Sequence, residues 1–78
     1  MKPVRIEGEL YVTLEIVADC YRVESAWLRR VYELGLLGQG RVRDTQLVIS
    51  ARRLDRVARI VQLHFHHGVS LELLDAVL

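Results

Sequence analysis

Apolar residues recur at helical spacing along residues 23–37, and this pattern predicts one amphipathic helix. Trp27, Leu28, Val31 and Leu34 lie three or four residues apart, so they share one face that we expect to be buried. The opposite face carries the charged residues Arg29, Arg30 and Glu33. The first and last of these are spaced for an ion pair across one helical turn.

A second, shorter periodic segment at residues 14–21 predicts another helix just before this one. Leu14, Val17, Ala18 and Tyr21 fall on its core face, and the Thr13 hydroxyl is placed to cap its first turn. The two helices are joined by a very short connection. The second is followed by a glycine at position 35, where a left-handed cap favours a residue without a Cβ. This arrangement predicts a helix-turn-helix unit.

The remaining pattern predicts strands on both sides of this unit and two further helices. Residues 1–12 alternate around Gly8, which indicates one or two short strands broken there. Residues 41–43 and 46–49 alternate around Asp44-Thr45 and predict a β-hairpin, the wing of a winged helix. Ser50 is the expected N-cap of a long helix at 51–67, ended by Gly68, and Ser70 opens a final helix at 71–78.

The long helix at 51–67 is expected to be amphipathic. Its predicted core stripe is Leu54, Val57, Ala58, Val61 and Phe65, widened by Ile60 and Leu63. The opposite side carries Arg52, Arg56 and Arg59, with Asp55 placed to pair with the first or the last of them. This arginine row is either a solvated face or a binding strip.

The length of the chain predicts one small domain, residues 1–78. Hydrophobic residues make up 51% of it, and its formal net charge is +1. There is no apolar run long enough to span a bilayer and no basic-then-apolar leader, so we expect a cytoplasmic protein without membrane contact. The single Cys20 has no internal disulfide partner and is expected to be a small buried hydrophobe. The fold expected from these elements is mainly α, a winged helix-turn-helix.

No residue pattern supports catalysis or a bound cofactor, so we interpret the chain as a non-enzymatic binding protein. His64 and His67 share a helix face, but two ligands without a Cys or carboxylate cluster do not predict a metal site. Trp27 is expected in the core with its indole N–H at the rim, the alternative being a ligand-stacking role. Arg41 and Arg43 either grip phosphates or protect an exposed strand edge.

The order of elements resembles the DNA-binding domain of MerR-type regulators. The resemblance is carried by Thr-Leu-Glu-Ile-Val-Ala at 13–18, Leu-Arg at 28–29, Gly-Leu-Leu at 35–37 and Gly-Val-Ser-Leu at 68–71. The chain departs from that family where a pair of tyrosines usually follows Leu-Arg and in its apolar second wing strand, and it stops at residue 78 without a dimerising helix. These departures argue against an independent DNA-binding role.

A short MerR-like domain with a tryptophan in its second helix and an apolar wing resembles the CbpM/DafA family of chaperone modulators. Further matching positions are Leu63 and Phe65 before Gly-Val, and Leu-Leu-Asp at 73–75. The resemblance implies a protein that binds a DnaJ-type J-domain co-chaperone, and its DafA-like character implies one that holds DnaK and DnaJ in one complex.

The exposed face of the helix-turn-helix unit is the expected contact surface. J-domains typically present a basic helix, to which acidic groups on this unit would be complementary; the alternative is that these carboxylates only solubilise the domain. The expected contact residues are Glu15, Asp19, Glu24, Arg29, Arg30 and Glu33. The alternative function is a small MerR-like or excisionase-like DNA-binding protein, with Arg29 and Arg30 in the major groove.

Overall fold

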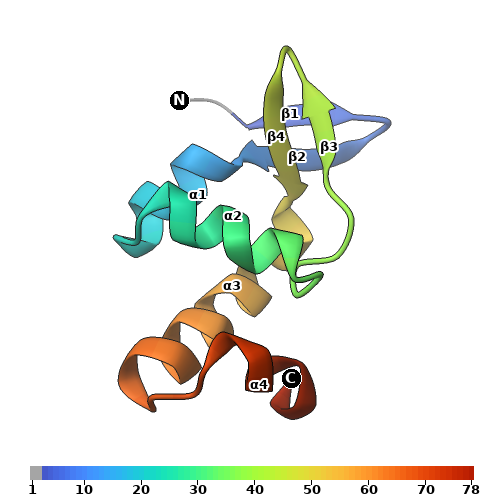
Figure 1. Ribbon diagram of the computed structural model, residues 1–78. Helices are drawn as coiled ribbons and strands as arrows, with labels where there is room; N and C mark the ends of the chain where they lie inside the picture. The colour runs from blue at the N-terminus through green and yellow to red at the C-terminus, as the bar shows by residue number, and fades with distance from the viewer. Residues whose placement is uncertain (1–2) are drawn as a thin grey trace.

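The structure is a computed structural model that describes residues 3–78, so Met1 and Lys2 of the predicted strand region lie outside it. Figure 1 shows a β-sheet at one end, two helices beside it and two further helices at the opposite end. The strands are β1 (Val4–Ile6), β2 (Glu9–Thr13), β3 (Arg41–Arg43) and β4 (Gln46–Ser50). The α-helices are α1 (Leu14–Tyr21), α2 (Ser25–Glu33), α3 (Leu54–Val61) and α4 (Leu71–Val77).

The fold is a small mixed α/β domain, so the prediction of a mainly α protein is confirmed only in part: four α-helices are present, but the sheet is larger than the single hairpin predicted. Both predicted strand regions form hairpins, and these join into one antiparallel four-stranded sheet with the order β1-β2-β4-β3. The joint is the pairing of β2 with β4, in which Val12 lies opposite Ile49. Because β4 contributes Val48 and Ile49 to the buried interior, the predicted wing is part of the body of the domain.

The arrangement of α1 and α2 is set by the residues that cap them. The Thr13 hydroxyl accepts a hydrogen bond from the Ile16 amide at 3.3 Å, as predicted, and α1 ends at Arg22 in a left-handed conformation with φ 58°. The end predicted at Gly35 is confirmed: Gly35, with φ 82°, turns the chain, and α2 ends at Glu33. This turn buries Leu36 and leaves Leu34 exposed, which reverses the prediction for Leu34.

The predicted helix at 51–67 is continuous but irregular. It begins with a 3-10 turn at Ala51–Arg53, capped by the Ser50 hydroxyl at 3.2 Å from the Arg52 amide, and it ends with a π turn at Gln62–His66. A π turn holds more residues than an α turn, so it rotates the side chains that follow out of the α-helical register. Accordingly Phe65, a predicted core residue, is 55% exposed.

Other predictions for α3 also need correction. Ala58 is exposed rather than buried. The Arg56 guanidinium donates to the Leu36 carbonyl, so this residue ties α3 to the turn after α2 instead of belonging to a solvated row. Asp55 takes part in neither of the ion pairs found within residues 3–78.

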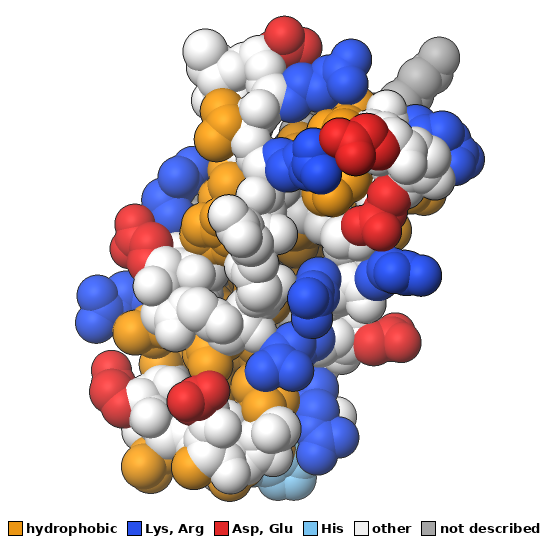
Figure 2. Space-filling model, turned by 90° about the vertical axis from the view of Figure 1, so that its right-hand side faces the viewer, with side chains coloured by type: hydrophobic (Ala, Val, Ile, Leu, Met, Phe, Trp, Pro, Cys, Tyr) orange, Lys and Arg blue, Asp and Glu red, His pale blue; other side chains and the backbone are white. Residues whose placement is uncertain are grey.

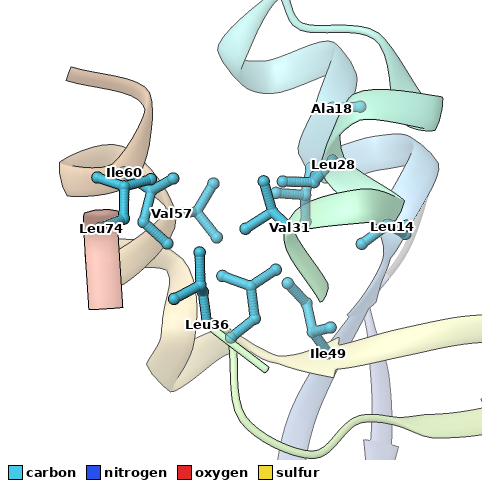
Figure 3. Close-up of a cluster of buried hydrophobic side chains, with 11 residues drawn as sticks. Leu14, Ala18, Leu28, Val31, Leu36, Ile49, Val57, Ile60 and Leu74 are labelled. Atoms are coloured by element: carbon cyan, nitrogen blue, oxygen red, sulfur yellow. The ribbon is translucent and has the colours of Figure 1, made fainter. Parts of the chain in front are cut away.

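The core lies where the two helical pairs and the sheet meet, as Figure 3 shows. Leu14, Leu28 and Val31 project from α1 and α2 toward Val57 and Ile60 of α3. Leu74 of α4 closes the far side, as expected for a short helix that cannot stand alone. All of these side chains are at most 1% exposed, so they form one core that is closed to solvent.

The second hairpin contains strained backbone, which gives a testable stability prediction. Asp44 and Thr45 have φ values of 50° and 63°, whereas the matching turn of the first hairpin has glycine at its second position, Gly8. A β-branched residue is unfavourable at positive φ. Thr45→Gly is therefore expected to raise the free energy of unfolding by about 0.5–1 kcal/mol in urea titration. Thr45→Ala, which keeps a Cβ, should gain less; an equal gain would contradict backbone strain as the cause.

Candidate functional site

Three acidic residues, Glu15, Asp19 and Glu24, line an open groove between α1 and α2. Its walls are Glu15, Ala18, Asp19, Val23, Glu24, Ser25 and Ala26. Glu15 and Asp19 lie one turn apart on the exposed side of α1, and the tight turn at Arg22 brings Glu24, at the start of α2, to the same place. Three exposed carboxylates around one concavity favour cationic side chains of a partner.

The other three predicted contact residues lie outside this groove. Arg29, Arg30 and Glu33 are exposed on α2 but do not line the concavity. The predicted Arg29–Glu33 ion pair is not formed, since the ion pairs within residues 3–78 are Arg41–Glu7 and Arg52–Glu9. The structure thus brings Glu15, Asp19 and Glu24 together and leaves the remaining three as separate surface charges.

The arginines of the second hairpin are partly engaged within the protein. Arg41 lies 3.3 Å from the Glu7 carboxylate, and its guanidinium carbon lies 5.7 Å from the centre of the Tyr11 ring. Contact with the Tyr11 hydroxyl and then with Glu7 raises the pKa of Arg41, so this side chain stays charged. Both arginines of β3 lie on an edge strand, which fits protection of that edge.

Figure 2 shows the side of the molecule away from the α1–α2 turn. Arginine side chains run along it from the sheet to the helical end, with carboxylates beside those near the sheet. The pairs Arg41–Glu7 and Arg52–Glu9 belong to the sheet and the segment after it. A row of cations that is interrupted by carboxylates has a weaker attraction for a phosphate backbone than a continuous basic strip.

An aromatic cluster connects α2 to the π turn. The Trp27 ring centre lies 4.9 Å from that of Phe65 and 5.5 Å from that of His64. The indole nitrogen is buried without a hydrogen-bond partner, so the prediction that it reaches the rim was wrong. His64 Nδ1 lies 2.8 Å from the Val69 carbonyl oxygen, which fixes the chain after Gly68. The cluster holds Phe65 in an exposed position.

Two further predictions concern a metal site and the single cysteine. Within residues 3–78 no group of three His, Cys, Asp or Glu side chains is placed to hold a metal ion. Cys20 is exposed, so its prediction as a buried hydrophobe was wrong; it lies on the outer side of α1. No described helix is long and apolar enough to cross a membrane.

A second concavity, on the other side of the α1–α2 turn, was not predicted from the sequence. It lies between Tyr21 and the face of α3 that continues into the π turn, and Phe65 stands at its border. Its apolar members were assigned to the core. The unusual run His-Phe-His-His at 64–67 was the available signal, because polar residues flanking an aromatic one make it hard to bury.

Comparison of the chain with protein-family models, with curated proteins and with solved structures finds no match.

Proposed function

We propose that this protein is a non-enzymatic chaperone modulator that binds a DnaJ-type J-domain co-chaperone and promotes a DnaK–DnaJ complex. In this proposal α1 and α2 form a MerR-like helix-turn-helix, the β3–β4 hairpin is its wing, and the groove between the helices receives the basic helix of the J-domain. The proposal rests on the resemblance to the CbpM/DafA family and, in the structure, on the groove.

The observation that carries the proposal is the convergence of Glu15, Asp19 and Glu24 on one exposed concavity. Charge complementarity of this kind steers association and orients the partner more than it adds affinity. The groove is an open concavity at the surface, so a partner can reach it. Its carboxylates take part in neither ion pair of residues 3–78, which leaves them available to a cation.

The DNA-binding alternative has weaker support. Arg29 and Arg30 are exposed on α2, but the acidic groove lies at the start of the same helix, where a recognition helix contacts base edges. Carboxylates there would face the DNA phosphates at close range and oppose binding. Arg41, which would grip the backbone, is paired with Glu7.

The first test is assembly. The purified chain is mixed with DnaK and DnaJ from the same cell, and the mass of each species is measured by size-exclusion chromatography with light scattering. We expect one peak that contains all three proteins and that is lost completely when this chain is omitted. Three separate peaks, with the chain shown to be folded by circular dichroism, would contradict the proposal.

The same purified protein is used to test the DNA-binding alternative. A DNA-binding protein should bind a mixed-sequence duplex with an affinity that falls steeply with salt, by about 0.9 log units per phosphate contact for each log unit of salt. We expect no such binding at physiological salt.

A further inference from the structure

The groove on the far side of the α1–α2 turn has an apolar floor, with one arginine and two histidines at its border. Two adjoining concavities share Tyr21, Val61 and His66, so they form one continuous groove. Arg22, His67 and the exposed ring of Phe65 complete its walls. No carboxylate lines any part of it, in contrast to the groove on the other side of the turn.

The apolar walls of this groove are held in place before any ligand arrives. The Tyr21 hydroxyl donates to the Leu54 carbonyl at 3.1 Å, which fixes its ring against α3. Phe65 is packed on Trp27 from behind, at 4.9 Å between ring centres, yet 55% of its surface remains exposed. A rigid, exposed aromatic ring loses little entropy when a partner covers it, which is why such residues dominate binding surfaces.

From this composition we propose that the groove binds a short peptide segment that combines a large apolar side chain with neighbouring carboxylates. The apolar side chain would lie between Tyr21 and Phe65. The carboxylates would meet the Arg22 guanidinium and the imidazole N–H groups of His66 and His67. The positive charge of Arg22 favours an acidic segment over a basic one. The carboxylates of the other groove favour a basic segment instead.

This inference goes beyond the proposed chaperone function and does not depend on it. One turn, residues 21–23, separates the two grooves, and Val23 borders both of them. The protein therefore offers two adjacent surfaces of opposite charge preference, which suits a module that contacts two different segments at once.

The test uses two synthetic six-residue peptides, each with Leu-Phe at its centre, flanked by glutamates in one and by lysines in the other. Each is titrated into the ¹⁵N-labelled full chain, and amide shifts are followed by NMR. We expect the glutamate peptide to shift the amides of Tyr21, Val61 and His66 in a saturable way. The lysine peptide should leave these amides unchanged and shift those of Glu15 and Asp19 instead.

Two variants with matched controls locate the binding. Phe65→Ala should weaken the glutamate peptide about tenfold, whereas Leu73→Ala, at an equally exposed leucine of α4, should not. Arg22→Asn removes the charge and suits the left-handed backbone, so it should fold and weaken binding about two- to fivefold. Its control is Arg43→Asn on the exposed strand β3, which should bind as the parent does.

Three results would overturn the inference. The first is equal shifts of the groove amides by both peptides, and the second is the absence of any saturable shift. The third is a shift of the same amides with protein concentration alone, which would assign the groove to a second copy of this chain. If the lysine peptide does not shift the amides of Glu15 and Asp19, that result would instead count against the proposed chaperone surface.

Discussion

Leu28→Ala is expected to lower the melting temperature of this protein by at least about 10 °C. Leu28 is fully buried where α2 faces α1 and α3, so its truncation leaves a cavity that rigid neighbours cannot fill. Such a change costs about 2–5 kcal/mol. A domain of this size has a total stability of only about 4–12 kcal/mol, so the loss is a large share of it. Thermal unfolding followed by circular dichroism measures the shift.

The control for this prediction removes the same atoms from the surface. Leu73→Ala lies on the outer side of α4, where the leucine is 60% exposed. Its melting temperature should stay within a few degrees of the parent, about 3 °C or less. Equal losses in the two variants would mean that the packing around Leu28 is not the one described.

The second large effect concerns the acidic groove. The double variant Asp19→Lys with Glu24→Lys is expected to weaken DnaJ binding at least about tenfold at low salt, because it replaces attraction of a basic helix by repulsion. The difference should shrink as salt rises, since exposed charges are screened within about 8–10 Å. Both residues are exposed and neither side chain makes a hydrogen bond that holds the fold, so the variant should fold. Isothermal titration calorimetry at two salt concentrations measures it.

A second double variant distinguishes an effect of the charges in the groove from an effect of the net charge of the protein. Asp55→Lys with Asp75→Lys changes the net charge by the same amount at exposed positions outside the groove. It should bind DnaJ like the parent. If both double variants lose affinity equally, the effect is one of net charge, and the groove has no special part in binding.

Local features of the fold were predictable from sequence because neighbouring residues determine them. The Thr13 and Ser50 caps, the Gly35 turn and the second hairpin follow from side-chain chemistry within a few positions. The union of the hairpins into one sheet was not predicted. It depends on pairing between Val12 and Ile49, which lie far apart in sequence and leave no local pattern.

Errors about burial arose where the backbone departs from a regular helix. Periodicity placed Leu34 and Phe65 in the core by assuming uninterrupted α geometry. The cap at Gly35 and the π turn change the direction of the chain just at these points, so both side chains are exposed. The Gly35 turn was predicted, but periodicity alone does not show that it leaves Leu34 outside the core, and no residue pattern indicated the π turn.

One part of the candidate site was also predictable from the sequence, and the other part was not. Glu15 and Asp19 are one turn apart, so their common face was predictable, and the short connection placed Glu24 near them. The groove bordered by Arg22 was not predictable, because it requires Tyr21 and Phe65 to meet across two elements that are distant in sequence. Its aromatic residues had also been assigned to the core, which removed them from consideration.

The position of Leu74 in the core has a consequence for synthesis on the ribosome. The interior side chains of α1 and α2 emerge first, but their partners on β4, α3 and α4 follow only at Ile49, Ile60 and Leu74. Until then Leu28 and Val31 can pack only against the neighbouring helix α1, and the nascent chain lacks the rest of its core. The complete interior therefore forms only after Leu74 has been added.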